Sequence, residues 1–336
     1  MIKEAIAALV EGNNLKEQEM MAVMDEIMEG DATEAQISAC ITALRMKGET
    51  IDEVTGAARI MRQKATRIDA RSSIIVDTCG TGGDGMHTFN ISTTAAFVTA
   101  AAGITVAKHG NRAVSSGCGS ADVLEALGVD ITAGPEIVEE CIHRIGIGFL
   151  FAQALHGAMK YAAKPRREIG IRTVFNMLGP LANPAGATSQ LIGVYDAKLT
   201  ETFAGVLRRL GTKRAFVVHG ADGLDEATVT AETRISELND GMISTYNIEP
   251  VSLFGTVYAP EELCGKDAET NARITIEVLS GVEGAARDIV LLNAGLAIVA
   301  GEKARTLEEG IAVARECIDG GCAMQKLRGL IEVSNS

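Results

Sequence analysis

The chain has 336 residues, 47% of them hydrophobic, so it can bury a sizeable core and is not generally disordered. Its 44 acidic residues outnumber 31 basic ones, and the net charge of −13 argues against a nucleic-acid or anionic-membrane surface. Seven scattered cysteines without a CxxC pair, and a start without a signal-peptide pattern, favour a cytoplasmic protein with reduced thiols. The longest apolar stretch, around 95–107, is too short and interrupted to span a bilayer.

Residues 1 to about 68 show only helical periodicity, in four short amphipathic segments. Thr33 with Gln36, and Thr50 with Glu53, have the spacing of capping boxes at the starts of the third and fourth helices. The four segments carry more apolar face than a small bundle can bury alone. We therefore expect them to dock onto the main domain or onto a second subunit.

From Ser73 onward the pattern alternates between strands and helices, which predicts a largely parallel sheet covered on both faces. The expected strands of this part are 74–76, 104–107, 147–151, 190–194 and 214–219. The stretch 225–260 departs from the alternation, and we expect it to add an antiparallel extension from three short strands, ATVT, RISEL and MISTYNI. Three helices are then expected at about 267–279, 284–300 and 306–319.

The stretch DTCGTGGDGMHTFNISTT, at 77–94, lies between the first strand and an alanine-rich helix. It has four glycines in six positions, namely Gly80, Gly82, Gly83 and Gly85. Glycine adopts positive φ at little cost and has no Cβ, so several backbone N–H groups can converge on one anion.

The helix that follows this loop starts with Asn90, Ser92, Thr93 and Thr94, whose polar groups lie where the helix dipole favours negative charge. The stretch therefore predicts a phosphate cradle, although it matches neither the Walker A nor the GxGxxG pattern. A tight turn that merely needs glycine is the alternative. The interspersed Thr81, Asp84 and Thr88 favour phosphate binding.

A second loop, from Lys108 to Ser120, follows the strand ITVA and so lies at a strand's carboxyl end, where open α/β sheets bind ligands. Its basic side chains, serines and glycines suit a second anionic group, and Ser120 is expected to cap the helix that begins at Ala121. A solvated basic loop is the alternative.

An acidic stretch, Asp222-Gly223-Leu224-Asp225-Glu226, follows the strand RAFVVHG. Mg²⁺ is typically held by one or two carboxylates together with substrate phosphates, and these carboxylates face the predicted phosphate site. Asp-Gly is equally a turn signal. The residues alone leave a magnesium site and a solvated acidic turn open.

The pair Arg166-Arg167 precedes the irregular run LGPLANPA. An arginine in this setting suits a planar carboxylate through a bidentate fork, but a surface basic pair is the simpler interpretation. Spacing does not tell which of the two faces inward. The five histidines are dispersed, and no strong general base is evident.

With these motifs in order, the chain resembles the anthranilate phosphoribosyltransferases, which join anthranilate to phosphoribosyl pyrophosphate (PRPP) in tryptophan biosynthesis. The matching stretches are DTCGTGGDG, NISTT, KHGNRAVSSGCGSADVLEALG, IRTVFNMLGPLANPA, DGLDE and LNAGLAIVAG. The resemblance implies an α/β fold with a small N-terminal all-α domain and a large domain whose mainly parallel central sheet is covered by helices. We expect the helical domain to span 1–68, with a contribution from about 165–185, and the large domain to span 73–336.

The resemblance also implies a homodimer formed through the helical domain, two Mg²⁺ ions per monomer, and an active site in the cleft between the domains. The positions it assigns to PRPP on the glycine-loop side are Gly80, Gly83, Asp84, Thr88, Asn90, Ile91, Ser92 and Thr93. Those it assigns on the second loop are Lys108, Asn111, Ser115, Ser116 and Ser120.

The metal ligands implied by the resemblance are Ser92, Asp225 and Glu226. Asn111 and Arg166 would receive anthranilate, Arg166 through the substrate's carboxylate.

No residue is assigned a chemical step; the candidates for positioning and electrostatics are Lys108, His109 and Asn111. One departure is visible, because His156 is followed by Gly157 where many family members have proline.

Two other functions are alternatives to this one. A pyrimidine nucleoside phosphorylase looks similar in fold and has a related Lys-His loop, but would need neither the acidic pair nor two metal ions. A non-catalytic homologue that binds nucleic acid would want a basic groove, against which the net charge of −13 argues.

Overall fold

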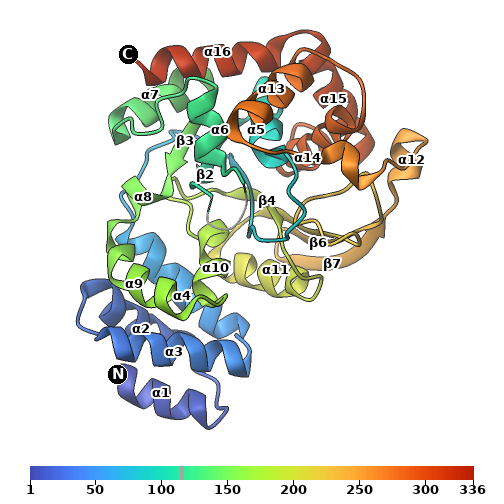
Figure 1. Ribbon diagram of the computed structural model, residues 1–336. Helices are drawn as coiled ribbons and strands as arrows, with labels where there is room; N and C mark the ends of the chain where they lie inside the picture. The colour runs from blue at the N-terminus through green and yellow to red at the C-terminus, as the bar shows by residue number, and fades with distance from the viewer. Residues whose placement is uncertain (114–116) are drawn as a thin grey trace.

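The computed structural model describes residues 1–113 and 117–336 and has two parts, a helical bundle and a helix-covered sheet (Figure 1). The bundle consists of α1 (Ile2–Val10), α2 (Glu17–Glu29), α3 (Glu34–Lys47) and α4 (Ile51–Lys64). Both predicted capping boxes are present: the Thr33 hydroxyl accepts from the Gln36 N–H and the Thr50 hydroxyl from the Glu53 N–H. The four predicted helices are therefore confirmed.

The sheet has seven strands in the order β3-β2-β1-β4-β5-β6-β7. Their bounds are β1 (Ile75–Gly80), β2 (Thr105–Gly110), β3 (Ile147–Phe151), β4 (Ser189–Gly193), β5 (Arg214–Gly220), β6 (Thr233–Asn239) and β7 (Met242–Ile248). The first five are parallel to one another, and β6 and β7 extend the sheet as an antiparallel hairpin. Asp240 and Gly241, which join the hairpin, both have positive φ, as a two-residue turn of this kind requires.

One predicted strand is wrong. Residues 227–230, the ATVT run, are irregular, with a bend at Val229 and Thr230, and form no strand. The hydroxyls of Thr228 and Thr230 bond to the carboxylate of Asp222, so this segment folds back on the acidic turn instead of pairing with the sheet. The other two runs of that stretch lie in β6 and β7, and the mainly parallel sheet is confirmed.

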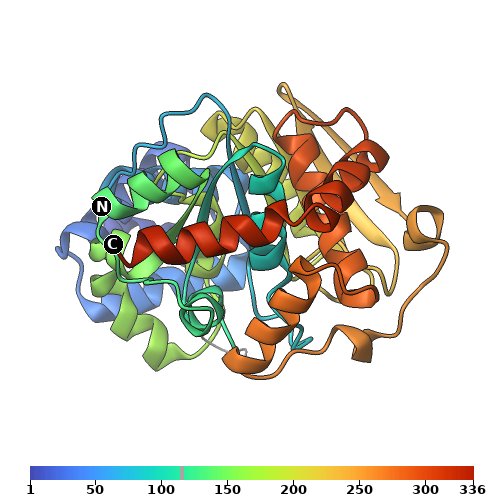
Figure 2. The same cartoon turned by 90° about the horizontal axis from the view of Figure 1, so that it is seen from above.

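Helices cover both faces of the sheet. Those between β1 and β5 are α5 (Ile91–Ala101), α6 (Ser120–Ala126), α7 (Pro135–Ile145), α8 (Ala152–Leu155), η1 (Gly157–Met159), α9 (Lys160–Ile169), α10 (Val174–Leu178), η2 (Gly179–Leu181) and α11 (Leu199–Leu210). Those after β7 are α12 (Pro250–Phe254), η3 (Pro260–Leu263), α13 (Ala268–Leu279), α14 (Ala285–Ala300), α15 (Leu307–Asp319) and α16 (Cys322–Ser334). The sequence did not predict α16, which crosses the top of the molecule against α5 and α7 (Figure 2).

Alternate residues of β4 and β5 face two different cores. Val76, Leu191 and Phe216 pack with α5 and α14 in one core, whereas Ile192 and Val217 join a core that includes the helical bundle. The bundle therefore shares its interior with the second face of the sheet.

The contact between the two parts runs through α4, which packs on α10 and α11. A Cβ at Gly205 of α11 would press on the side chain of Ile51, so glycine permits this close approach. The helix α9 adds to the bundle by packing on α2 and α3. The expected docking of the bundle onto the main domain is confirmed, and docking onto a second subunit stays a prediction.

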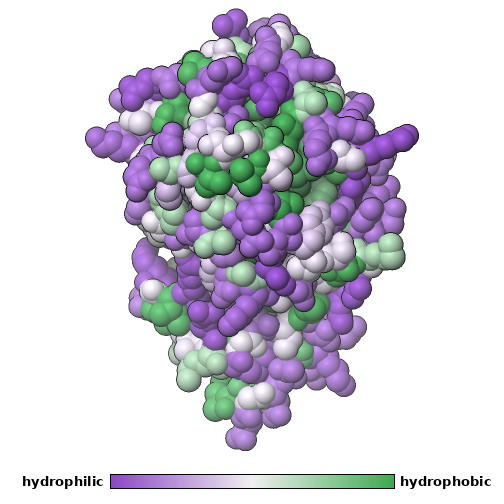
Figure 3. Space-filling model, turned by 90° about the vertical axis from the view of Figure 1, so that its right-hand side faces the viewer, coloured by the Kyte–Doolittle hydropathy of each residue, from purple (hydrophilic) through white to green (hydrophobic). Residues whose placement is uncertain are grey.

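The surface on one side of the molecule is mostly hydrophilic, and most of its apolar residues gather in the upper half of the view (Figure 3). Within residues 1–113 and 117–336, no helix is both long and apolar enough to cross a membrane.

Candidate functional site

The candidate site lies where the strand order reverses. After β1 the chain adds β2 and β3 on one side, and then crosses to add β4 and β5 on the other. In open α/β sheets, ligands bind outside the carboxyl ends of the strands at such a switch point. The glycine loop after β1, the end of β4 and the acidic turn after β5 meet there.

The glycine loop and the acidic pair are bonded directly to each other. Gly82 N–H donates to the Asp225 carboxylate (2.6 Å), and the Ser92 N–H, in the first turn of α5, donates to Glu226 Oε1 (3.2 Å). The Asp84 carboxylate accepts from the Asp225 N–H (3.4 Å). The predicted phosphate cradle and the predicted metal ligands therefore form one site.

Glycine is needed in this site for two different reasons. Gly82, Gly83 and Gly85 have φ between +69° and +78°, which side-chain-bearing residues rarely adopt. Gly80 and Gly193 have ordinary backbone angles, but a Cβ on either would overlap Asp225. The acidic turn is thus seated against the ends of β1 and β4.

The acidic pair is almost entirely removed from water, with Asp225 9% and Glu226 7% exposed. Burial, together with the charges of Asp84 and Glu226, raises the pKa of Asp225 well above its usual value. Burial also raises the pKa of Glu226 to about 7, although the Lys108 charge opposes the shift. Among the hydrogen bonds of the described residues, Glu226 Oε2 has no partner.

This donor set fits Mg²⁺. Buried carboxylates and an unpartnered oxygen are stabilised by a cation, and Mg²⁺ prefers oxygen ligands. Within the two described segments, no three His, Cys, Asp or Glu side chains gather as a complete protein-only metal site. A magnesium ion at Asp225 and Glu226 would therefore complete its coordination with substrate phosphate and water.

Asp77 forms a second buried centre beside the acidic pair. Its carboxylate accepts from the His109 N–H (3.0 Å) and from Asn183 Nδ2 (2.8 Å). Lys108, only 3% exposed, donates to the Thr78 carbonyl (2.5 Å) and attracts the charges of Asp77 and Glu226. The predicted basic residue Lys108 therefore lies inside the site and not in a solvated loop.

His109 and His156 form a buried pair with their Nε2 atoms 3.2 Å apart. His109 Nδ1 lies 3.1 Å from the Gly179 carbonyl and must donate to it, so Nε2 of a neutral His109 accepts from His156. Burial lowers the pKa of His109 to about 3 and that of His156 to about 4. Both rings are therefore neutral near pH 7.

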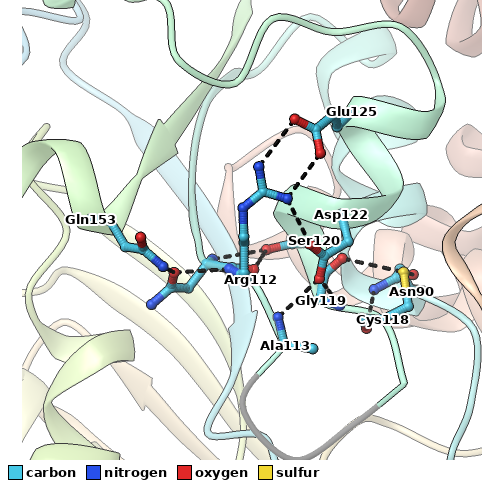
Figure 4. A network of polar contacts seen from close by, with 10 residues as sticks. Asn90, Arg112, Ala113, Cys118, Gly119, Ser120, Asp122, Glu125 and Gln153 are labelled. Atoms are coloured by element: carbon cyan, nitrogen blue, oxygen red, sulfur yellow. Dashed lines mark hydrogen bonds and ion pairs between the residues drawn. The ribbon is translucent and has the colours of Figure 1, made fainter.

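The second loop is held at both ends by one carboxylate (Figure 4). Asp122 Oδ2 accepts from the Ala113 N–H (2.9 Å) and the Gly119 N–H (2.8 Å), while Arg112 pairs with Asp122 and Glu125. Sequence reasoning missed Asp122, although its place in the first turn of a helix is a signal for anchoring backbone N–H groups. The predicted site residues Ser115 and Ser116 lie outside the described residues.

The prediction that Ser120 caps a helix is wrong. The helix α6 already begins at Ser120, and its N-cap residue is Gly119. The Ser120 hydroxyl instead accepts from the Asn111 N–H (3.1 Å). The Asn111 side chain reaches across to Gln153 after β3, whose Nε2 donates to it (3.1 Å). Both residues therefore hold the start of the second loop.

The remaining predicted residues lie around these loops. Asn90 is the N-cap residue of α5, but its side chain bonds to the Cys118 carbonyl (3.2 Å) and to Asn271 on α13 (3.0 Å). Thr88 pairs with Cys264 through the backbone, in an isolated antiparallel β-bridge. Sequence reasoning missed Asn271 because its partner is 181 residues away in the chain.

Of the two neighbouring arginines, Arg166 is half-buried and lies over the ring of Phe175 (5.2 Å), and Arg167 is exposed. The inward residue is therefore Arg166, on α9 at the bundle side of the site. Arg172 was missed, and its guanidinium bonds to the Gly83 carbonyl at the tip of the glycine loop while covering Tyr195.

Comparison with known proteins places this architecture in a family. Residues 3–65 match the helical bundle domain of a glycosyl transferase family, and residues 72–324 match that family's a/b domain. An anthranilate phosphoribosyltransferase from Syntrophobacter fumaroxidans is 57% identical over 335 residues, covering 100% of this chain and 99% of the relative. This chain belongs to the anthranilate phosphoribosyltransferase family.

Solved structures of anthranilate phosphoribosyltransferases agree with this fold. The enzyme from Thermus thermophilus superposes with a TM-score of 0.94 at 41% identity, covering 99% of both chains. The enzyme from Saccharomyces cerevisiae, solved in complex with PRPP and Mg, superposes with a TM-score of 0.83 at 29% identity, covering 95% of this chain and 92% of that one.

Proposed function

We propose that the protein transfers the phosphoribosyl group of PRPP to the amine of anthranilate. The products are N-(5-phosphoribosyl)anthranilate and pyrophosphate, in the second step of tryptophan biosynthesis from chorismate. The observation that carries the proposal is the acidic pair, Asp225 and Glu226, buried against the glycine loop and the first turn of α5. In this arrangement backbone N–H groups, carboxylates and Lys108 lie together at the carboxyl ends of the central strands.

The phosphate groups of PRPP are proposed to lie along the glycine loop and the start of α5. The residues proposed to bind them are Gly80, Gly83, Asp84, Thr88, Asn90, Ile91, Ser92 and Thr93. The helix dipole makes the start of a helix favourable for anions, and the Ser92 N–H at the start of α5 already donates to one, the Glu226 carboxylate. Lys108 adds a buried positive charge, and Asn111, Ser115, Ser116 and Ser120 are proposed to close the second loop over the substrate.

Magnesium is the proposed cofactor, held by Asp225, Glu226 and Ser92, with two ions per monomer. When bound, Mg²⁺ neutralises the charge that develops on the departing pyrophosphate. The protein's part is to leave Glu226 Oε2 without a partner among the described residues and to seat Asp225 against Gly80 and Gly193.

Anthranilate is proposed to bind on the bundle side, with its carboxylate at Arg166 and its amine near Asn111. The amine nitrogen bonds to C1 of the ribose as the C1–O bond to pyrophosphate breaks, and both electrons of that bond leave with pyrophosphate. The nitrogen then loses one proton, which the departing pyrophosphate accepts. A neutral aromatic amine is already nucleophilic, so positioning does most of the work, and it can supply roughly 7–11 kcal/mol of a barrier.

The domain arrangement follows from the same proposal. We propose a helical domain over 1–68, joined by part of 165–185, and an α/β domain over 73–336, with anthranilate between them. We also propose a homodimer formed through the helical domain, and cytoplasmic location stays a prediction. The packing of α9 on α2 and α3 supports the assignment of that segment to the helical side.

The test follows the fluorescence of anthranilate in the presence of the protein and PRPP, with and without Mg²⁺. We expect the signal to fall only when both PRPP and Mg²⁺ are present. No loss of signal from a folded protein would contradict the proposal. Thymidine or uridine with phosphate would then test the nucleoside phosphorylase alternative.

A further inference from the structure

A single carboxamide lies at the centre of the apolar helix α14. Asn293 is 0% exposed, and its neighbours along the helix, such as Leu292 and Ala294, are apolar and equally buried. Burying a polar amide costs free energy unless its hydrogen bonds are made. The position therefore calls for specific partners.

Those partners lie in the acidic turn. Asn293 Oδ1 accepts from the Ala227 N–H (3.1 Å), and Nδ2 donates to the Ala227 carbonyl (2.8 Å) and to the Ile289 carbonyl (2.8 Å). The side chain thus binds both peptide groups of Ala227, as a neighbouring strand would. Ala227 is the residue directly after Glu226, and it is itself fully buried.

This clamp constrains the direction of Glu226. The N–H of Ala227 belongs to the same planar peptide group as the carbonyl of Glu226, so fixing that N–H limits rotation about the Glu226 backbone. On the other side, Asp225 is fixed by the Gly82 N–H and by its seat against Gly193. The acidic pair is therefore held from both ends, with α14 supplying one of them.

We infer that Asn293 is a positioning residue that aims the Glu226 carboxylate at the divalent cation bound with PRPP. The inference rests on the proposed function. It gives a role to the LNAGLAIVAG stretch, which lies outside the residues assigned to substrate or metal. Asparagine is suited to the task because its carboxamide offers one acceptor and two donors in a fixed plane.

The substitution Asn293→Asp separates positioning from filling of the core. The side chain keeps its shape and the acceptor for the Ala227 N–H, but it loses both donors and brings a negative oxygen towards two carbonyls. The matched control is Ile298→Ala, which weakens the same helix at another fully buried position and leaves the Ala227 bonds intact. Asn293→Ala is a second variant for the case that Asn293→Asp does not fold.

The first readout is the binding of Mn²⁺ to the full-length protein in the presence of PRPP, measured from the electron paramagnetic resonance of free Mn²⁺. Residues that orient metal ligands typically change affinity by about 10- to 100-fold, and we expect a loss in this range for Asn293→Asp. The KM for anthranilate should change less than twofold, and Ile298→Ala should bind Mn²⁺ as the wild type does.

The second readout needs no variant. Hydrogen exchange in the wild type should show a protected amide at Ala227. Rapid exchange there would overturn the inference, as would unchanged Mn²⁺ affinity in a folded Asn293 variant. If the wild type binds no Mn²⁺ in the presence of PRPP, the proposed function is wrong and so is the inference. If the wild type binds Mn²⁺ and a folded Asn293 variant binds it equally well, only the inference is wrong.

Discussion

Two buried carboxylates at the same edge of the sheet differ in how completely the protein satisfies them. Asp77, at 0% exposure, accepts from the His109 N–H and from Asn183, and the Lys108 charge is close to it. Glu226, at 7% exposure, accepts from the Ser92 N–H on one oxygen, and its other oxygen has no partner among the described residues.

We propose that this difference separates a structural carboxylate, Asp77, from one that binds a ligand, Glu226. A buried group whose hydrogen bonds are complete stabilises the fold, and its loss leaves other groups unpaired. A buried group with an open oxygen costs stability in the ligand-free protein and gains its partner from a ligand. We therefore expect substitutions at Asp77 to affect folding and substitutions at Glu226 to affect turnover.

The largest expected effect is that of Glu226→Ala. We expect kcat at saturating Mg²⁺ to fall by roughly 10³-fold, because charge stabilisation of the leaving group is lost, with a much smaller change in the KM for anthranilate. The midpoint of thermal unfolding should stay the same or rise. The exposed Glu261→Ala is the matched control. An unchanged kcat would remove Glu226 from the metal site.

Asp77→Ala should mainly lower stability. It leaves the His109 N–H and Asn183 Nδ2 without an acceptor and removes the charge opposite buried Lys108, so we expect a loss of about 3 kcal/mol in the free energy of unfolding. Urea denaturation measures it, and Asp77→Asn, which keeps the volume, should lose less. If the midpoint of urea unfolding is the same for Asp77→Ala as for the wild type, the distinction between the two carboxylates is wrong.

Gly193→Ala tests whether turnover depends on the close contact between Gly193 and the backbone of Asp225. A Cβ there would overlap the Asp225 carbonyl oxygen, which is backbone and cannot rotate away. Displacement of a catalytic group by about 1 Å can cost roughly 10²-fold in rate, and we expect a fall of that order in kcat. Gly157→Ala, where a Cβ meets nothing within 4 Å, is the control and should act like the wild type. Equal activity of the two variants would contradict the close approach.

The smallest expected effect is a pH dependence of stability caused by His156, which contacts the Asp77 partner His109. The pKa of His156 is lowered by burial to about 4, below its ordinary value of 6.5, so between these pH values the unfolded chain binds the proton that the folded chain excludes. Stability should thus be complete above pH 6.5 and fall as the pH drops towards 4. We expect His156 to account for about 2.5 kcal/mol at pH 4.5. In His156→Gln the free energy of unfolding should vary less over this range, and an equally steep curve would show that His156 is not the cause.

The parts of the site that are local in sequence could be predicted. The glycine spacing, the strand ends and the capping boxes each depend on neighbouring residues, and the loop after β1 does lie against the acidic turn as the motifs suggested. Composition and periodicity also predicted the mainly parallel sheet. The exception is the ATVT run, where high strand propensity lost to hydrogen bonds between threonine hydroxyls and Asp222.

Contacts between distant segments could not be predicted. Asn293 reaches a residue 66 positions away, and Asn271 reaches Asn90 across 181 positions. Both are asparagines within helices, where nothing local distinguishes a clamp from an ordinary polar residue. Arg166 and Arg167 show the same limit, because only the packing of α9 determines which one faces inward.

The most direct test of the contrast between Asp77 and Glu226 is a crystal structure of the wild type grown with PRPP and Mn²⁺, in which anomalous scattering locates the metal. We expect a Mn²⁺ peak about 2 Å from Glu226 Oε2, with Asp77 keeping its bonds to His109 and Asn183. A metal that contacts neither Asp225 nor Glu226, with Oε2 bonded to a protein group instead, would contradict the account.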